Sequence, residues 1–279
     1  ARRHGAESVP RLPAGEGWVF VELVDYDEAT LAQRAGALLE ATAHVDGWIV
    51  TDPVEVAALW KIRADGAGLA GVSLDRAAYA GWEDAAVPPE KLGAYLRDFD
   101  ALMTKHGVRG LPYGHFGDGC VHCRIDFPLS DEDGPNAYRT FVEEAADLVA
   151  SYGGSISGEH GDGRARSALL PRMYSAEAIA LMGKVKALFD PDNHLNPGVL
   201  VDPRPVEAEL RVPAIRKAPL RRTHPEFVEH VHRCSGVGKC VSDEGASGQV
   251  MCPSYRATGD EKDSTRGRSR VLQELVNGE

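Results

Sequence analysis

Two histidines flank a glycine-rich stretch in the segment YGHFGDGCVHCRIDF, residues 113–127. The glycines permit a tight turn, so His115 can fold back over the start of a strand that contains His122. Side chains alternate along a strand, so this one is predicted to have an apolar face and a polar face. The apolar face contains Val121, Cys123, Ile125 and Phe127, and the polar face contains His122, Arg124 and Asp126. Two histidines and an arginine at a glycine turn favour a metal or substrate site over a polar face that simply contacts water.

A second acid and histidine lie between glycines in SGEHGDGRARS, residues 157–167. Glu159 and His160 are adjacent, and the flanking glycines would let the chain turn so that both face one site. With His115 and His122, Glu159 makes a set of two histidines and one carboxylate, which suits zinc, manganese or iron and leaves positions open for a substrate. Cys120 is a rival ligand beside the loop, whereas Cys123 is expected to be a buried thiol.

Three cysteines near the end of the sequence have spacing typical of an iron-sulfur site. Cys234, Cys240 and Cys252, the last followed by proline, fit the first, third and fourth places of the bacterial C-x2-C-x2-C-x3-C-P run, although eleven residues separate the last two. Val237 stands at the second place. The pattern indicates a three-iron cluster, or a four-iron cluster with a substitute ligand. Three unrelated cysteines are the alternative.

The overall composition is that of an ordinary globular protein and excludes several classes. The 279 residues carry a net charge of −11, which argues against nucleic-acid binding because that needs a basic surface. No apolar run reaches the roughly 20 residues needed to span a bilayer. We therefore expect a cytoplasmic protein, or one bound peripherally at the inner face of the membrane.

Secondary-structure patterns place these motifs on an α+β framework. Strands are predicted at residues 18–24, 47–50, 108–114, 121–127 and 155–157, and helices at 27–43, 53–65, 88–107, 136–154 and 173–189. The helix at 53–65 has an N-cap in Asp52 and a proline at its first position. This order predicts one antiparallel sheet with helices on one face, a ferredoxin-like cap, followed by a helical iron-sulfur segment.

The predicted domains are a cap or substrate domain at 1–203, a linker at 204–222 and the start of an iron-sulfur domain at 223–279. Between Arg204 and Cys240, eight Lys or Arg stand against four Asp or Glu. This local excess of positive charge suits a solvated linker, with docking of an acidic partner domain as the alternative.

In combination, the motifs resemble a known family. GHFGDGCVH, SGEHGDGRARS and FDPDNHLNPG resemble the C-terminal signatures of FAD-linked oxidases of the vanillyl-alcohol-oxidase type, in the branch that oxidises D-2-hydroxy acids. The cysteine segment is similar to the iron-sulfur region fused to some of these dehydrogenases. The resemblance runs from about residue 17 to the end. It implies that a separate N-terminal domain binds the FAD, that this chain begins inside the cap domain, and that further iron-sulfur ligands follow Glu279.

The resemblance also implies residue roles. His115, His122 and Glu159 would hold a divalent metal, with zinc as the expected ion, and His160 would be the base near the flavin. Asn196 would lie near the isoalloxazine, and Arg63 would bind a substrate carboxylate. Cys120 and Arg124 replace two asparagines that are usual in the family, and an extra arginine favours a second carboxylate on the substrate.

The expected function is therefore oxidation of a D-2-hydroxy acid of the 2-hydroxyglutarate or lactate class. Arg63 and Arg124 would hold its carboxylate oxygens, and electrons would pass from FAD through the cluster to a quinone or an electron-transfer protein. The fragment alone is expected to be inactive. Two alternatives need no flavin: a metal-dependent hydrolase that uses the histidine and carboxylate set, and a non-catalytic electron-transfer module in which only the cysteines matter.

Overall fold

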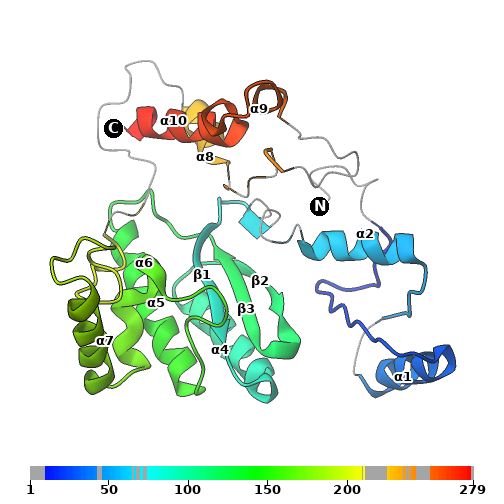
Figure 1. Cartoon of the computed structure of the whole chain (residues 1–279). Helices are drawn as coiled ribbons and strands as arrows, with labels where there is room; N and C mark the ends of the chain where they lie inside the picture. The colour runs from blue at the N-terminus through cyan, green and yellow to red at the C-terminus, as the bar shows by residue number, and fades with distance from the viewer. Residues whose placement is uncertain are drawn as a thin grey trace. The chain divides into compact units, whose positions relative to one another are not determined.

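The computed structural model describes residues 10–42, 46–64, 66, 70–71, 74–208, 210, 225–234, 236, 238, 240–242 and 252–277 (Figure 1). The chain divides into two compact units, residues 1–69 and 70–279. The first unit contains helices α1 (Glu28–Ala41) and α2 (Pro53–Ala64). The second contains one sheet and the remaining helices, and it is the unit that carries the clustered histidines.

The two helices of the first unit begin where the sequence predicts. The Asp27 carboxylate caps α1 by accepting from the Thr30 backbone N–H at 2.7 Å. Asp52 caps α2 in the same way, accepting from the N–H groups of Val54 and Glu55, each at 2.9 Å. Both caps satisfy N–H groups that have no partner inside the helix.

The strands predicted at 18–24 and 47–50 are wrong, because both segments are extended without pairing to another strand. The valines of the first segment are exposed, as in Val19 and Val24. A β-branched run becomes a strand only when a partner satisfies its backbone groups, and the described part of this unit offers none.

The sheet of the second unit has three antiparallel strands in the order β1-β3-β2. They are β1 (Tyr79–Ala86), β2 (Gly110–His115) and β3 (Cys120–Ile125). The predicted hairpin at 108–127 is confirmed as β2 and β3, with Tyr113 opposite His122 and His115 opposite Cys120. The predicted strand at 155–157 is reduced to a single bridge between Ser155 and Ala86.

Helices α4 (Leu92–Lys105) and α5 (Gly134–Ser151) cover one face of this sheet (Figure 1). Their buried rings interlock: Phe99 of α4 lies 6.3 Å from Trp82 of β1 and 6.1 Å from Phe141 of α5, centroid to centroid. The apolar face predicted for the central strand is confirmed, since Val121, Cys123, Ile125 and Phe127 all belong to this core. The predicted α+β class with helices on one face is therefore observed.

Strand β1 was missed by the sequence analysis because its burial does not alternate. The register with β3 slips twice, between Tyr79 and Trp82 and between Trp82 and Ala85. In each interval the chain advances by three residues along β1 and by two residues along β3. As a result Trp82 and Ala85 both pack into the helix-covered core. Bulges of this kind re-aim side chains beside functional sites.

The remaining elements of the second unit are short helices and loops. After β1 come η3 (Pro89–Lys91) and, in the hairpin turn, η4 (Phe116–Asp118); after α5 come α6 (Gly163–Arg166), η5 (Ser167–Arg172) and α7 (Ala176–Phe189). The C-terminal helices are α8 (Pro225–His232), α9 (Pro253–Thr258), η6 (Glu261–Asp263) and α10 (Thr265–Asn277). Most of the predicted linker at 204–222 lies outside the described residues. No helix in the described ranges is long and apolar enough to cross a bilayer.

The hairpin turn is fixed against β1 at one glycine. Gly119 has φ +71°, and its carbonyl accepts from the Val87 N–H at 3.0 Å. A Cβ at Gly119 would overlap the Val87 carbonyl oxygen, whereas one at Gly117 in the same turn would meet open space. The turn between the two histidines therefore depends on the absence of a side chain at Gly119.

We predict that Gly119→Ala destabilises the chain by about 2 kcal/mol or more, because it combines a left-handed backbone with a clash against backbone atoms. Gly117→Ala is the matched control and should change the free energy of unfolding by less than about 0.5 kcal/mol. Urea denaturation followed by circular dichroism measures both. Equal midpoints for the two variants would contradict the role of Gly119.

Candidate functional site

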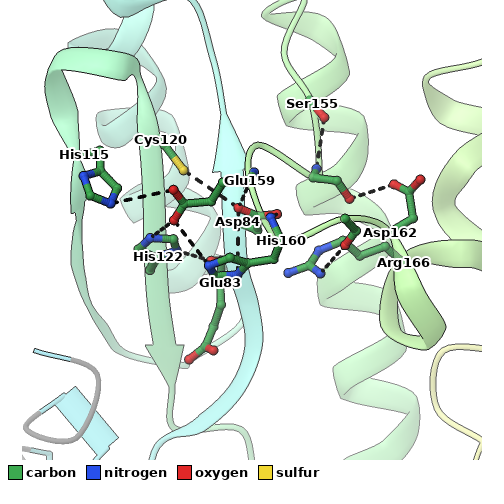
Figure 2. A network of polar contacts seen from close by, with 12 residues as sticks. Glu83, Asp84, His115, Cys120, His122, Ser155, Glu159, His160, Asp162 and Arg166 are labelled. Atoms are coloured by element: carbon green, nitrogen blue, oxygen red, sulfur yellow. Dashed lines mark hydrogen bonds and ion pairs between the residues drawn. The ribbon is translucent and has the colours of Figure 1, made fainter.

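Three segments converge on the sheet face opposite α4 and α5 (Figure 2). They are β1, the β2–β3 hairpin and the loop at residues 157–162. Ligand atoms from Asp84, His122, Glu159 and His160 all lie within 4.8 Å of one another. In the part of the chain that the structure describes, this is the only cluster of three or more His, Cys, Asp or Glu side chains with that spacing.

The Glu159 carboxylate lies at the centre of the cluster. One of its oxygens, Oε1, is 2.9 Å from His122 Nε2 and 3.3 Å from His160 Nε2. The other, Oε2, is 3.7 Å from His115 Nε2. The structure thus brings together all four residues predicted from the two glycine-rich motifs.

His122 is oriented by a backbone contact. It is almost completely buried, and its Nδ1 bonds to the carbonyl oxygen of Glu83. A carbonyl can only accept, so Nδ1 carries a proton and Nε2 is the ring nitrogen that faces Glu159. Metal-binding histidines are commonly held in this way. The His160 ring stacks on His122, with centroids 5.0 Å apart and planes 4° apart.

Asp84 is a member of the cluster that the sequence analysis missed. Its side chain is fully buried, and its two oxygens accept the backbone N–H groups of Glu159 at 3.0 Å and His160 at 2.8 Å. The adjacent acids of the WEDAA segment, placed inside an otherwise apolar strand, were the available signal. That segment has no clear periodicity, so it did not stand out.

Cys120 lies beside the cluster and is buried at the start of β3. Its Sγ is 3.8 Å from an Asp84 oxygen. Burial, together with the negative charges of Glu159 and Asp84, raises the pKa of this thiol to about 11. Without a bound cation the group is therefore a neutral thiol. Cys123, as predicted, is a buried thiol in the core, and burial raises its pKa as well.

The predicted polar face of β3 does not simply meet water. Asp126, which the alternation places on the polar face, is fully buried and accepts the Arg109 N–H at 2.6 Å. Arg124 is mostly buried and places its Nε 2.9 Å from a Glu83 carboxylate oxygen. Beyond His122, this face is thus occupied by paired charges.

A cavity of about 450 Å³ adjoins the cluster. Glu83 and His160 line one part of it, and Arg164 and Arg166 line another. Arg166 donates to the Gly161 carbonyl at 3.0 Å, and Arg164 donates to the carbonyls of residues 205 and 208. These two arginines, which the sequence analysis left without a role, give the cavity a basic wall next to His160.

Comparison with known proteins fits this geometry. The sequence profile of the family described as "FAD linked oxidases, C-terminal domain" matches residues 3–200, which include every residue of the cluster. The chain belongs to this family.

Curated relatives of this chain include proteins named as dehydrogenases of D-2-hydroxyglutarate and D-lactate and a subunit of glycolate oxidase. The chain is 32% identical to D-2-hydroxyglutarate dehydrogenase of Escherichia coli strain K12, over 97% of the chain and 28% of the relative. It is 34% identical to D-lactate dehydrogenase of Archaeoglobus fulgidus, over 67% of the chain and 42% of the relative. It is 35% identical to the glycolate oxidase subunit GlcD of Bacillus subtilis, over 42% of the chain and 25% of the relative. The chain therefore spans less than half of the length of these relatives.

Asn196 lies in the FDPDNHLNPG loop, outside the histidine cluster. The loop is held by Asp190, which accepts the N–H groups of His194 at 2.9 Å and Leu195 at 2.8 Å and also pairs with Lys186. Lys186 in turn donates to the Leu195 carbonyl. Asn196 itself has φ +48°, a left-handed conformation that asparagine tolerates better than most residues. The domain thus presents Asn196 from a rigid turn.

Arg63 lies on α2 in the first unit. The two units are described separately, so the structure does not test the prediction that Arg63 and Arg124 bind the same substrate.

One backbone hydrogen bond joins two of the three cysteines of the C-terminal segment. Cys252 donates its N–H to the Cys240 carbonyl at 3.1 Å, and both side chains are buried, while Cys234 is half-buried. The N–H of Tyr255 in α9 and the hydroxyl of Thr265 hold the pKa of Cys252 down at about 7. Cys252 is therefore prepared to be a thiolate near neutral pH.

We predict that Asp190→Asn loosens the loop that carries Asn196. The Lys186 ammonium and the Leu195 N–H lower the pKa of Asp190, so its bonds persist below the usual aspartate pKa of 3.8 and are lost only as the pH falls through the lowered value. The variant should show faster amide hydrogen exchange at His194 and Leu195 at pH 7. The control Asp192→Asn, in the same loop, should exchange like the unmodified chain. Unchanged exchange in Asp190→Asn would contradict the anchoring role.

Proposed function

We propose that this chain forms the substrate and metal half of a flavin-dependent dehydrogenase that oxidises a D-2-hydroxy acid of the 2-hydroxyglutarate or lactate class. The single observation that carries the proposal is the cluster of His122, Glu159 and His160 on one sheet face, in a domain of the FAD-oxidase family. The names of the relatives agree with this substrate class. A separate flavin-binding domain would complete the active site.

The residues of the cluster fit a divalent metal. Nε2 of His122 would be the ligand atom because Nδ1 is bonded to a carbonyl, and Glu159 supplies an adjacent carboxylate. His115 is the third proposed ligand, although its Nε2 lies farther out. Nitrogen and oxygen ligands of this kind suit zinc, and three protein ligands leave room for a substrate oxygen. A metal held there would lower the pKa of the substrate hydroxyl.

His160 is the proposed base. Its ring lies beside Glu159, borders the cavity and is half exposed, so a hydroxyl proton could reach it. Oxidation of a 2-hydroxy acid removes that proton and the hydrogen on C2, and the flavin would accept the latter as hydride. Holding the proton at His160 leaves the substrate oxygen free to become the carbonyl of the 2-oxo acid.

Basic residues would hold the carboxylates of the acid. Arg124 is already paired with Glu83 through Nε, so its terminal nitrogens would have to meet the substrate. Arg63, on α2 of the first unit, is the second arginine proposed to bind a substrate carboxylate. Arg164 and Arg166 add positive charge to the cavity wall, which would favour a substrate with a second carboxylate.

The C-terminal cysteines are proposed to hold an iron-sulfur cluster that receives electrons from the flavin. The lowered pKa of Cys252 suits a thiolate ligand. Ligands of a cluster bind different iron atoms, so the three thiols need not be as close as the ligands of a single ion. A three-iron cluster and a four-iron cluster with a substitute ligand remain the two forms proposed, and a quinone or an electron-transfer protein would be the final acceptor.

We predict that His160→Ala slows flavin reduction by D-2-hydroxy acids about 10²- to 10⁴-fold, the usual contribution of a general base, while the metal content stays unchanged. The experiment uses the holoenzyme that contains this chain and its flavin domain, with anaerobic bleaching of the flavin and metal analysis. His230→Ala on α8 is the control. Normal reduction would exclude the base role, loss of metal would make His160 a ligand, and hydrolysis of an ester without flavin would favour the hydrolase alternative.

We predict that Cys252→Ser removes most of the iron and acid-labile sulfide from protein purified without oxygen, because a serine hydroxyl is a poor ligand for iron in a cluster. Cys123→Ala changes a cysteine that lies in the sheet core and should leave both contents intact. Iron, sulfide and visible absorption are the measurements. Equal iron and sulfide in the two variants would contradict the proposed cluster site.

A further inference from the structure

We infer that Asp84 is the positioning residue of the metal site, a carboxylate that sets the conformation of the 158–160 turn and is not itself a metal ligand. This inference rests on the proposed metal site. It concerns the residue of the cluster that no sequence motif singled out, and it explains how two adjacent side chains, Glu159 and His160, can both face the same point.

Asp84 binds three successive backbone N–H groups. Its own carbonyl accepts from Gly158 at 2.8 Å, Oδ1 accepts from Glu159 at 3.0 Å, and Oδ2 accepts from His160 at 2.8 Å. Successive N–H groups directed at one anion form a concave binding site for negative charge. Here the anion belongs to the protein, and the turn is wrapped around it.

The burial of Asp84 strengthens this argument. A fully buried carboxylate is costly unless hydrogen bonds compensate for the lost water. Charge-assisted bonds from backbone N–H groups are among the stronger ones available. The two N–H bonds to the Asp84 side chain therefore stabilise the carboxylate and fix the turn at the same time.

The same contacts make Asp84 less suited than Glu159 to be a metal ligand. Oδ1 accepts the Glu159 N–H and faces the Cys120 thiol at 3.8 Å, so both of its lone pairs have a donor. Oδ2 accepts the His160 N–H, which leaves it one further lone pair. Glu159, in contrast, directs both carboxylate oxygens at histidine nitrogens. The ligand and the positioning carboxylate are thus distinguishable by what they bind.

Close packing keeps the turn against β1. A Cβ at Gly158 would come within 2.9 Å of the Ala86 side chain and 3.2 Å of Cys120 Sγ. Only glycine allows the backbone to approach β1 closely enough for the three bonds to Asp84 to form. The glycine before Glu159 and the acid on β1 are therefore two parts of one arrangement.

The test is the affinity of the full chain for Zn²⁺, measured by competition with a chelator in the unmodified protein and in Asp84→Asn. The amide keeps one acceptor but replaces the other with an N–H group that cannot accept. We expect affinity to fall about 10- to 100-fold, as is usual when a residue behind a ligand is changed. The matched control is Asp126→Asn, which alters an equally buried carboxylate that accepts the Arg109 N–H away from the cluster and should leave affinity unchanged.

A second readout separates positioning from ligation. With Co²⁺ at saturating concentration, Asp84→Asn should give the same visible absorption spectrum as the unmodified protein, because the set of ligand atoms is the same. A changed spectrum at saturation would make Asp84 a ligand and overturn the inference. Unchanged Zn²⁺ affinity would overturn it too, while leaving the metal site in place. If the unmodified chain binds neither ion, the metal site and the inference both fail.

Hydrogen exchange of the unmodified chain keeps the inference testable if Asp84→Asn does not fold. The side chains of Glu159 and His160 are 40% and 49% exposed, yet their amides should exchange slowly because each is bonded to a buried carboxylate. The amide of Gly161, at the exposed end of the turn, is the internal reference. Exchange at Glu159 and His160 as fast as at Gly161 would overturn the inference.

Discussion

The bulged pairing of β1 with β3 is the constraint on which the site depends. Two slips in register place Trp82 and Ala85 in the core. The intervening residues, Glu83 and Asp84, contribute to the opposite face of the sheet. From there the Glu83 carbonyl fixes the ring of His122, and the Asp84 carboxylate fixes the turn of Glu159 and His160. A regular strand would have sent one of these neighbours into the helices. Two adjacent residues of one strand thus control the orientation of three functional side chains.

The charges around the cluster are arranged in layers. The central carboxylate of Glu159 faces histidine nitrogens, while the more deeply buried carboxylate of Asp84 is bonded to backbone N–H groups. Arg124 is paired with Glu83, and Arg164 and Arg166 line the adjoining cavity. Negative charge is therefore concentrated where a cation would bind, and positive charge where an acid would enter. This separation is what a site for a metal and a carboxylate substrate requires.

Sequence reasoning found the site better than it found the framework. His115, His122, Glu159 and His160 stood out because reactive side chains between glycines are uncommon, and the structure gathers all four. The helices with clear caps or strong periodicity, such as α1, α2 and α5, were also predictable. Strand β1 was not, because its bulges remove the alternation by which a strand is recognised. The unpaired segment at 18–24 failed for the opposite reason: its residues favour a strand, but pairing is decided by partners that a local pattern does not contain.

The burial of Asp126 is another feature that the local sequence pattern does not predict. An aspartate on the polar face of a strand is usually solvated, and the Arg109 N–H and the Arg76 guanidinium, both far away in the sequence, compensate for its burial. Asp84 differs from Asp126 in that its partners belong to functional residues. The position of a buried acid in the sequence does not tell whether it matters for the chemistry, because that depends on the segment that the acid contacts.

The bonds between Asp84 and the 158–160 turn join residues that are 75 and 76 positions apart in the chain. Closing so long a loop costs conformational entropy before any contact forms, and contacts of this range are made late when a chain folds. The nascent or partly unfolded polypeptide therefore holds the histidines and the glutamate on separate segments, with little affinity for a cation. An ion bound by this cluster would then be a ligand of the native state alone, and it would add stability in proportion to the logarithm of its concentration. Its binding would require that β1, the hairpin and the turn have all assembled.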